Sequence, residues 1–191
     1  MSEHMALENL TVLDLTRVLA GPFCTMMLAD MGANVIKIEV PKGGDDTRGY
    51  PPFRAKNLNG ERESVYFANI NRNKKGITLN LKAPEGKEIF KELVKKADVV
   101  VENYRPGVMD KLGLGYDVLK EINPRIIYAA VSGFGCYGPY HLRPGYDILA
   151  QAMGGMMSIT GAKGGEPTRA GSALGDILGG LHVTIGILAA V

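Results

Sequence analysis

The feature of this sequence that most constrains its fold is the alternation of short β-branched or apolar runs with longer segments of helical spacing. Strands are predicted at 12–15, 35–38, 77–81, 99–101 and 126–131, and helices at 20–31, 85–96 and 116–122. This alternation is typical of parallel strands joined by helical crossovers. It predicts a doubly wound, mainly parallel, Rossmann-like α/β sheet flanked by helices, in which ligands bind beyond the carboxyl ends of the strands.

The charges and cysteines exclude several classes of protein. The 22 basic and 20 acidic residues are spread along the chain, so neither a nucleic-acid-binding nor a membrane-binding face is predicted. Cys24 and Cys136 lie far apart, without a CxxC pair or a nearby histidine. We therefore expect no disulfide framework and no metal site, and a reducing cytoplasm as the location.

The two ends of the chain suggest a cloning remnant at the N-terminus and a truncation at the C-terminus. Residues 1–5 are interpreted as a cloning remnant before the native start. The apolar run 177–191 contains two adjacent glycines and a histidine and is shorter than the roughly 20 residues that span a bilayer, so a buried helix is expected. No capping Gly, Asn or Pro ends it, and we expect the chain to be truncated within this helix.

The turn after the first strand contains Ala20-Gly21-Pro22, which allows a tight turn and a helix whose first amides could meet an anion. A plain strand-to-helix turn fits the spacing as well. Glu39 lies at about the distance expected for the acidic residue of a dinucleotide site, but the GxGxxG pattern is missing. A nicotinamide cofactor is therefore not expected.

Lysines flank the third predicted strand. Lys74 and Lys75 precede it and Lys82 follows it, so these cations could hold phosphates or could lie on a solvated loop. The preceding segment 41–62 is rich in glycine and proline and too long for a plain connection, which indicates a functional or mobile loop.

Two further segments carry residues that could bind or react with a ligand. Asn103, Tyr104 and Arg105 follow the fourth strand and could meet an adenine or pantetheine group, or form a capped turn. Asp176 follows Gly175 at the start of the last helix, where an aspartate is usually an N-cap. The same position would keep a carboxylate ionised beside amides that stabilise an oxyanion, as a nucleophilic carboxylate requires.

The order of these segments resembles the family III CoA transferases, the superfamily that includes formyl-CoA transferase and carnitine CoA-transferase. The matching stretches are 12–15, 20–22, 32–39, 73–75, 97–103 and 174–176, and the resemblance covers residues 10–191. It implies that 6–191 is the N-terminal part of the large CoA-binding domain of an interlocked homodimer. It also implies acyl-CoA and a small carboxylic acid as substrates, without a permanently bound cofactor.

The resemblance also implies site residues. Asp176 matches the catalytic aspartate, which attacks the acyl-CoA thioester and passes through an aspartyl mixed anhydride and an aspartyl-CoA thioester. The positions that match CoA contacts are Val18, Leu19, Ala20, Leu79, Lys82, Asn103, Tyr104, Lys111 and Leu112. Val40 stands where formyl-CoA transferase has an arginine, so the grip on the nucleotide phosphates would fall to Lys42 or Arg105.

Two alternatives remain open. An α-methylacyl-CoA racemase would use a histidine in a Gly-His-Asp-Ile motif, whereas this chain has Gly145-Tyr146-Asp147-Ile148, a phenol in place of the imidazole. His182 lies in the apolar helix, where a core or interface histidine is expected. A non-catalytic CoA-binding module would need the crevice but not Asp176.

Overall fold

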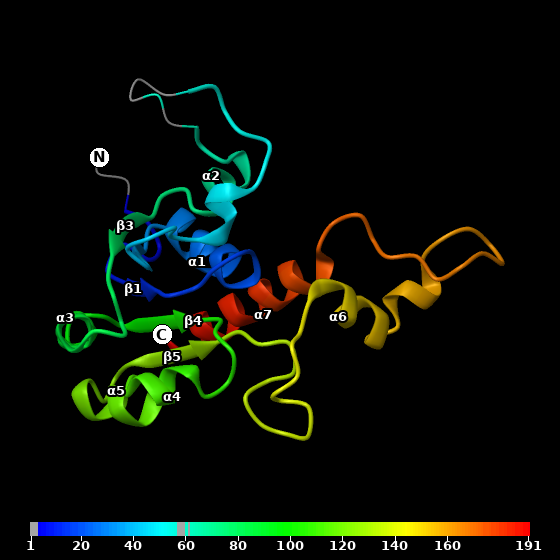
Figure 1. The fold of residues 1–191 in the computed structure, drawn as a ribbon. Helices are drawn as coiled ribbons and strands as arrows, with labels where there is room; N and C mark the ends of the chain where they lie inside the picture. The colour runs from blue at the N-terminus through cyan, green and yellow to red at the C-terminus, as the bar shows by residue number, and fades with distance from the viewer. Residues whose placement is uncertain (1–3, 57–59, 61) are drawn as a thin grey trace.

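A five-stranded parallel sheet organises the chain (Figure 1). The computed structural model describes residues 4–56, 60 and 62–191. The strands are β1 (Thr11–Asp14), β2 (Asn34–Glu39), β3 (Lys75–Thr78), β4 (Val99–Glu102) and β5 (Ile127–Ala130), in the order β3-β2-β1-β4-β5. Every neighbouring pair is parallel, which confirms the predicted α/β class.

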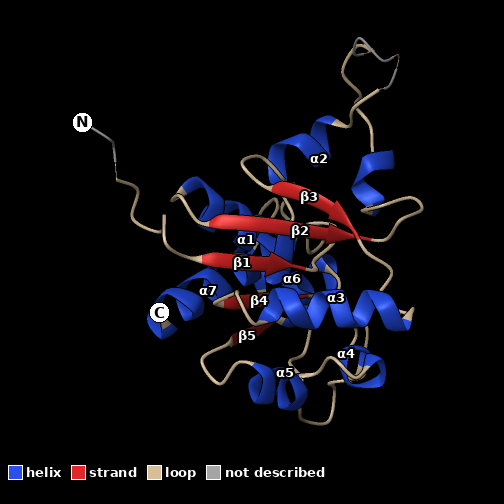
Figure 2. Ribbon diagram, turned by 90° about the vertical axis from the view of Figure 1, so that its left-hand side faces the viewer, coloured by secondary structure: helices blue, strands red, loops and turns tan. Residues whose placement is uncertain are grey.

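Helices cover both faces of the sheet (Figure 2). They are α1 (Ala20–Asp30), α2 (Val65–Ile70), α3 (Pro84–Val94), α4 (Val108–Leu112), α5 (Tyr116–Ile122), α6 (Asp147–Met153) and α7 (Leu174–Ala190), with short 3-10 turns at Asp46–Gly49 and Met156–Ile159. The core on one face includes side chains of α1 and α7, and that on the other includes side chains of α3, α4 and α5. The short helices α2 and α6 were not predicted from the sequence.

The central strands supply both cores because successive side chains point to opposite faces. Val12 packs with α1 and α7, whereas its neighbour Leu13 packs on the other face. In β4, Val99 and Val101 join the first core and Val100 joins the second. A strand that is buried on both sides reads as a continuous apolar run, which is why its position was predictable.

The predicted position of the third strand was wrong by two or three residues. Instead of 77–81, β3 spans Lys75–Thr78, and the ladder ends where the Leu79 amide donates to the Glu39 carbonyl at 2.8 Å. The Asn80 side chain then accepts from the Lys82 amide at 3.1 Å and starts a turn. Leu81 is buried under that turn, so its apolar character reflects core packing and not strand structure.

The last helix runs alongside α1 and makes a close approach at Gly180. A Cβ atom at Gly180 would lie 2.4 Å from the Ala20 carbonyl oxygen, so the two backbones meet where only a glycine fits. Further along, Ile187 packs in the same core as Leu28 of α1. The two helices therefore run in parallel, and α7 begins at the same edge of the sheet as α1.

The predicted burial of the terminal helix holds for one of its sides. Thr184 and Ile187 are buried, but Ile185 is 55% exposed. His182 is also exposed, and its Nδ1 lies 2.8 Å from the Leu178 carbonyl oxygen within the same helix. It is therefore not a core histidine of this chain, and the interface histidine stays a prediction. None of the helices in the described part of the chain is long and apolar enough to cross a membrane.

Candidate functional site

The sheet order reverses between β1 and β4, which places the ligand crevice of a doubly wound fold beyond the carboxyl ends of these two strands. The Asn103 side chain bridges this point. Its Oδ1 accepts from the Arg17 amide at 2.8 Å, and its Nδ2 donates to the Arg17 carbonyl at 2.6 Å. Asn103, one of the predicted CoA contacts, thus holds the turn after β1 in place.

That turn contains an uncommon backbone conformation at Val18. Its φ is 69°, in the left-handed region that β-branched residues rarely adopt. The Val18 amide donates to Asp45 Oδ1 at 3.3 Å. Strain of this kind costs about 1–3 kcal/mol, and it persists where the surroundings enforce it and tends to occur at ligand sites.

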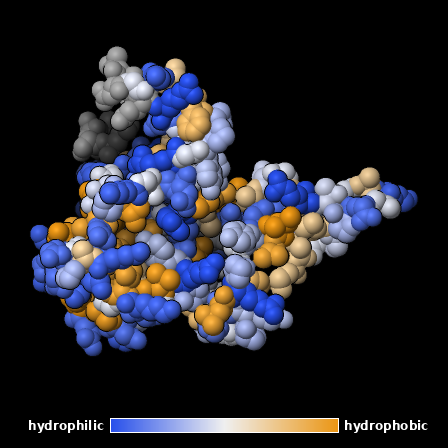
Figure 3. Space-filling view, in the orientation of Figure 1, coloured by the Kyte–Doolittle hydropathy of each residue, from blue (hydrophilic) through white to orange (hydrophobic). Residues whose placement is uncertain are grey.

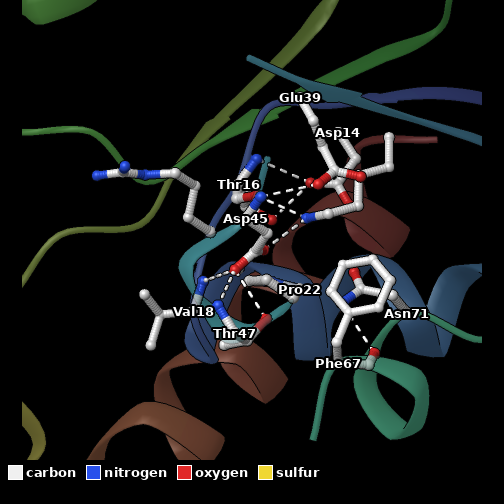
Figure 4. Close-up of polar contacts among 12 residues, drawn as sticks. Asp14, Thr16, Val18, Pro22, Glu39, Asp45, Thr47, Phe67 and Asn71 are labelled. Atoms are coloured by element: carbon white, nitrogen blue, oxygen red, sulfur yellow. Dashed lines mark hydrogen bonds and ion pairs between the residues drawn. The ribbon is translucent and has the colours of Figure 1, made fainter. Parts of the chain in front are cut away.

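A buried polar cluster lies directly beneath the turn (Figure 4). We define it as Asp14, Thr16, Thr25, Lys37, Asp45 and Lys74. Asp14 Oδ1 accepts from the amide and hydroxyl of Thr16 at 2.9 and 2.5 Å. Asp14 Oδ2 accepts from the Thr25 hydroxyl at 2.7 Å and from Lys74 Nζ at 3.1 Å.

The second lysine of the buried polar cluster links β2 to the loop that follows it. Lys37 Nζ donates to Asp45 Oδ2 at 2.9 Å and to the Thr16 carbonyl at 2.8 Å. Burial alone would raise the pKa of Asp14 and of Asp45, but the neighbouring lysine charges and hydrogen bonds hold both values below the usual range. The start of segment 41–62 is therefore fixed by ion pairing. This segment was predicted to be functional or mobile, and its residues 57–59 and 61 lie outside the described residues.

The alternative in which Lys74, Lys75 and Lys82 hold phosphates together was wrong, because these side chains do not gather at one place. The Lys74 side chain is 2% exposed and is committed to Asp14, so the solvated-loop alternative fails for it as well. Lys75 begins β3 and donates to Asn34 Oδ1 at 2.7 Å at the amino edge of the sheet. Lys82 lies beyond the opposite, carboxyl end of the same strand, because a strand separates them.

The remaining predicted CoA contacts lie in segments that follow the carboxyl ends of β1, β3 and β4. Leu79, Tyr104 and Leu112 are partly buried against the core, whereas Lys82, Arg105 and Lys111 are exposed. Val40 and Lys42 are exposed after β2. A small hollow of about 10 Å³ lies at this edge, lined by Thr16, Arg17, Ile38, Glu39, Val40, Gly44, Asp45 and Tyr104.

Glu39 is already paired. Both of its carboxylate oxygens accept from Arg48, at 2.8 Å from Nε and 2.6 Å from an Nη atom, and one also accepts from the Asp45 amide at 2.8 Å. Burial raises the pKa of Glu39, but the Arg48 hydrogen bonds and charge outweigh it and lower the value. The position that binds a ribose in dinucleotide-binding folds is thus occupied by an arginine of the same chain.

Asp176 is the third residue of α7 and does not cap that helix, so the N-cap interpretation was wrong. The N-cap position belongs to Ala173, and the cap is supplied from α6, where Asp147 Oδ1 accepts from the Gly175 amide at 2.8 Å. The Leu174 amide is bonded to the Ser172 carbonyl. Two of the first three amides of α7, expected to stabilise an oxyanion, are therefore already engaged.

The electrostatic environment of Asp176 differs from the expectation for a helix N-terminus. Its carboxylate is half-buried and receives no hydrogen bond from the residues that the structure describes. Burial, and then the charge of Asp147, raise the pKa of Asp176 above its usual value. Tyr66 of α2 lies within its field, because the Asp176 charge adds to the effect of burial in raising the Tyr66 pKa.

The packing of α7 on α1 brings Asp176 near the start of α1. Asp176 precedes Gly180 by about one helical turn, and Gly180 contacts the backbone of Ala20, which opens α1 directly after the Val18 turn. The predicted nucleophile and the predicted contacts of the first turn thus gather at one edge of the sheet. They come from segments more than 150 residues apart.

A larger cavity of about 620 Å³ lies elsewhere, at the β5 edge of the sheet between α4, α5 and the end of α7. Burial raises the pKa of Glu102 on its wall, and the Tyr128 hydroxyl donates to Glu102 Oε1 at 3.2 Å. None of the predicted CoA contacts lines this cavity. Its size alone therefore does not make it the candidate site.

This chain is similar to known proteins over nearly its whole length. Residues 7–191 match the model of a family described as CoA-transferase family III. Human succinyl-CoA:glutarate CoA-transferase is 49% identical over 190 residues, which cover 99% of this chain and 42% of the relative. Acetyl-CoA:oxalate CoA-transferase of Acetobacter aceti is 50% identical over 185 residues, covering 96% of this chain and 46% of the relative.

A solved structure matches over the same region. The crystal structure of a CAIB/BAIF family protein from Brucella suis has a TM-score of 0.93 and 46% identity, covering 98% of this chain and 49% of the other. The chain spans about half the length of the curated relatives that it matches.

Proposed function

This chain belongs to CoA-transferase family III, and from that membership we propose that the protein containing it moves coenzyme A from an acyl-CoA donor to a carboxylic acid, with Asp176 as the nucleophile. The observation that carries the proposal is the setting of Asp176. Its half-buried carboxylate has no hydrogen-bond donor among the described residues and lies about one helical turn before Gly180, where α7 meets the start of α1. A carboxylate with a raised pKa is more basic, and therefore a better nucleophile, than one in water.

The chemistry proposed for Asp176 has four steps. A carboxylate oxygen of Asp176 attacks the thioester carbonyl, the C–S bond breaks, and CoA thiolate leaves behind an aspartyl mixed anhydride. The thiolate then attacks the aspartyl carbonyl and releases the donor acid, which gives an aspartyl-CoA thioester. The acceptor carboxylate displaces the thiolate to form a second anhydride. Attack of the thiolate on the acceptor carbonyl finally yields the new acyl-CoA and free Asp176.

Coenzyme A is proposed to lie across the carboxyl edge of the sheet. The exposed cations Lys82, Arg105 and Lys111 are available there for phosphate groups, with Lys42 near the position of the missing arginine. The partly buried Tyr104 offers an aromatic surface in the same region. The enforced turn at Val18 would fix backbone groups close to the pantetheine arm.

The nucleophile can be tested in the complete protein that contains this chain. Asp176→Asn keeps the shape of the side chain but removes the anion, so kcat for CoA exchange should fall by several orders of magnitude, while the affinity for CoA changes little. Incubation of the wild type with acyl-CoA and then hydroxylamine should convert Asp176 to a hydroxamate, which peptide mass spectrometry detects. Asp117→Asn, at a highly exposed site on α5, is the matched control. It should keep normal CoA exchange and should still form the hydroxamate at Asp176.

Near-normal exchange by Asp176→Asn, or a hydroxamate on another aspartate, would refute the assignment. Retained CoA binding without any exchange by the wild type would favour a non-catalytic module. Exchange of the α-proton of a branched acyl-CoA, without transfer between acids, would favour a racemase despite Tyr146 in place of its histidine.

The acids can be proposed as a class. The named relatives act with succinyl-CoA or acetyl-CoA and with glutarate or oxalate, at nearly equal identity to this chain. We therefore propose short dicarboxylic acids as acceptors. A panel of succinate, glutarate, oxalate and mesaconate, with matched monocarboxylates as controls, tests this class through the acyl-CoA products; preference for monocarboxylates would contradict it.

A homodimer is proposed for the complete protein. Apolar side chains gather over α6 where it projects from the sheet (Figure 3), and they include Ile148, Leu149 and Met153. Exposed apolar patches of this kind usually mark interfaces. Sedimentation velocity of the complete protein should give a dimer, and a monomer at micromolar concentration would contradict the proposal.

A further inference from the structure

Two polar side chains of α6 face the chain that leads into α7. Gln151 is 2% exposed, and its amide is fully engaged. Its Nε2 donates to Asp147 Oδ2 at 2.8 Å and to the Ser172 carbonyl at 3.3 Å, and its Oε1 accepts from the Ala170 amide at 2.8 Å. One buried side chain therefore connects α6 to two residues of the segment that precedes Asp176.

Asp147 completes the connection one helical turn earlier. Its Oδ2 receives Gln151, and its Oδ1 accepts from the amide of Gly175, the residue directly before Asp176. The contact is tight, because a Cβ atom at Gly175 would lie 2.8 Å from Ala150 Cβ. The first turn of α7 is thus held from α6 by hydrogen bonds on both sides of Ala173.

We propose that Asp147 and Gln151 are positioning residues for Asp176, and that they fix the first turn of α7 so that its carboxylate meets the thioester. This inference rests on the proposed function of Asp176. It assigns a supporting role to Asp147, which lies in the stretch Gly145-Tyr146-Asp147-Ile148.

A purely structural cap accounts less well for the choice of residues. Capping the Gly175 amide alone requires only one acceptor oxygen, which a neutral asparagine at position 147 would also supply. Asp147 instead places a second carboxylate beside the nucleophile and helps to raise the Asp176 pKa. The ionisable groups that face Asp176 are Asp147 from α6 and Tyr66 from α2, so no cation among the described residues offsets this effect.

The test separates hydrogen bonding from charge. In Asp147→Asn, one amide oxygen can still cap Gly175, but the new NH₂ group opposes the NH₂ group of Gln151. Adding Gln151→Glu restores the donor–acceptor pair with residue 147 and keeps an acceptor for the Ala170 amide, while the negative charge moves away from Asp176. The bond to the Ser172 carbonyl is lost, so the double variant rebuilds the bonds to residue 147 and Ala170 without the original charge beside Asp176.

We expect kcat of the complete enzyme to fall about 100-fold in Asp147→Asn, because a displacement of about 1 Å is worth that much, while KM for acyl-CoA stays within about threefold. The double variant should recover part of this loss, because it restores the bonds to residue 147 and Ala170 but not the bond to Ser172. Its activity should extend to lower pH than that of the wild type, since removing the neighbouring charge lowers the Asp176 pKa and keeps the nucleophile ionised in more acidic solution.

Wild-type kcat in Asp147→Asn, or a double variant no better than the single one, would overturn the proposal while Asp176→Asn still tests the nucleophile separately. If Asp147→Asn does not fold, Gln151→Met tests the same proposal, because methionine conserves the side-chain volume and leaves the Asp147–Gly175 hydrogen bond in place. Lower kcat with unchanged KM is expected there, and unchanged kcat would overturn the inference.

Discussion

Replacing Lys74 with methionine tests how much the ion pair between Lys74 and Asp14 in the buried polar cluster contributes to stability. The change removes the ammonium group that donates to Asp14 Oδ2 and to the Pro22 carbonyl, and it leaves Asp14 as a buried carboxylate. Methionine matches the length of the lysine stem and fills its space. The loss of stability therefore reports the missing charge and not a cavity.

The size of the effect follows from what Asp14 keeps. Removing one partner of a buried ion pair costs about 3–5 kcal/mol. Asp14 would retain its bonds from Thr16 and Thr25, and the Lys37 charge that also lowers its pKa. We therefore expect the lower end of that range, about 3 kcal/mol.

The effect should depend on pH. In the wild type, the lowered pKa of Asp14 contributes stability that is present above the unfolded pKa and is lost as the pH falls through the folded one. Without Lys74 the Asp14 pKa rises, so the folded variant binds a proton more readily. The difference between variant and wild type should thus be largest near neutral pH and shrink in acid.

Urea unfolding at fixed protein concentration measures the free energy of unfolding. Lys75→Met is the matched control: the neighbouring lysine is exposed and bonded to Asn34 at the surface, so a loss of no more than about 0.5 kcal/mol is expected. Equal losses for the two variants, or a Lys74→Met penalty that does not change between neutral and acid pH, would refute the reasoning.

Two further predictions concern packing and thiol chemistry. Gly180→Ala should destabilise the complete protein by about 1–3 kcal/mol in the same unfolding assay, because its Cβ would lie 2.4 Å from the Ala20 carbonyl oxygen. Gly179→Ala, with no atom within 4 Å of its Cβ, should stabilise α7 by up to about 1 kcal/mol; the reverse order would contradict the α1–α7 contact. Iodoacetamide at pH 8 should alkylate the exposed Cys136 but not Cys24, because burial raises the Cys24 pKa to about 11. Peptide mass spectrometry measures the labelling, and equal labelling of the two cysteines would show that α7 does not cover Cys24 of α1.

The sequence by itself determined the fold class and the positions of the central strands. In 12–15 and 99–101 every residue is apolar or buried, because these strands lie between two helical layers, and such runs are recognisable without any tertiary information. The order of the short motifs then indicated the family and the residue that matches its nucleophile. Edge strand β3 was misplaced because its own residues are exposed and the apolar residues after it belong to a turn.

Only the tertiary structure decided what the polar residues do. Lys74 and Lys75 are adjacent in the sequence and equally basic, yet one is buried with Asp14 and the other lies on the surface, because that choice depends on contacts up to 60 residues away. The cap of α7 comes from Asp147 and not from the local Asp176, since a side chain 28 residues earlier reaches the Gly175 amide. Local patterns specify strands and helices through side-chain periodicity, whereas ion pairs and caps from distant segments depend on where the fold brings those segments together.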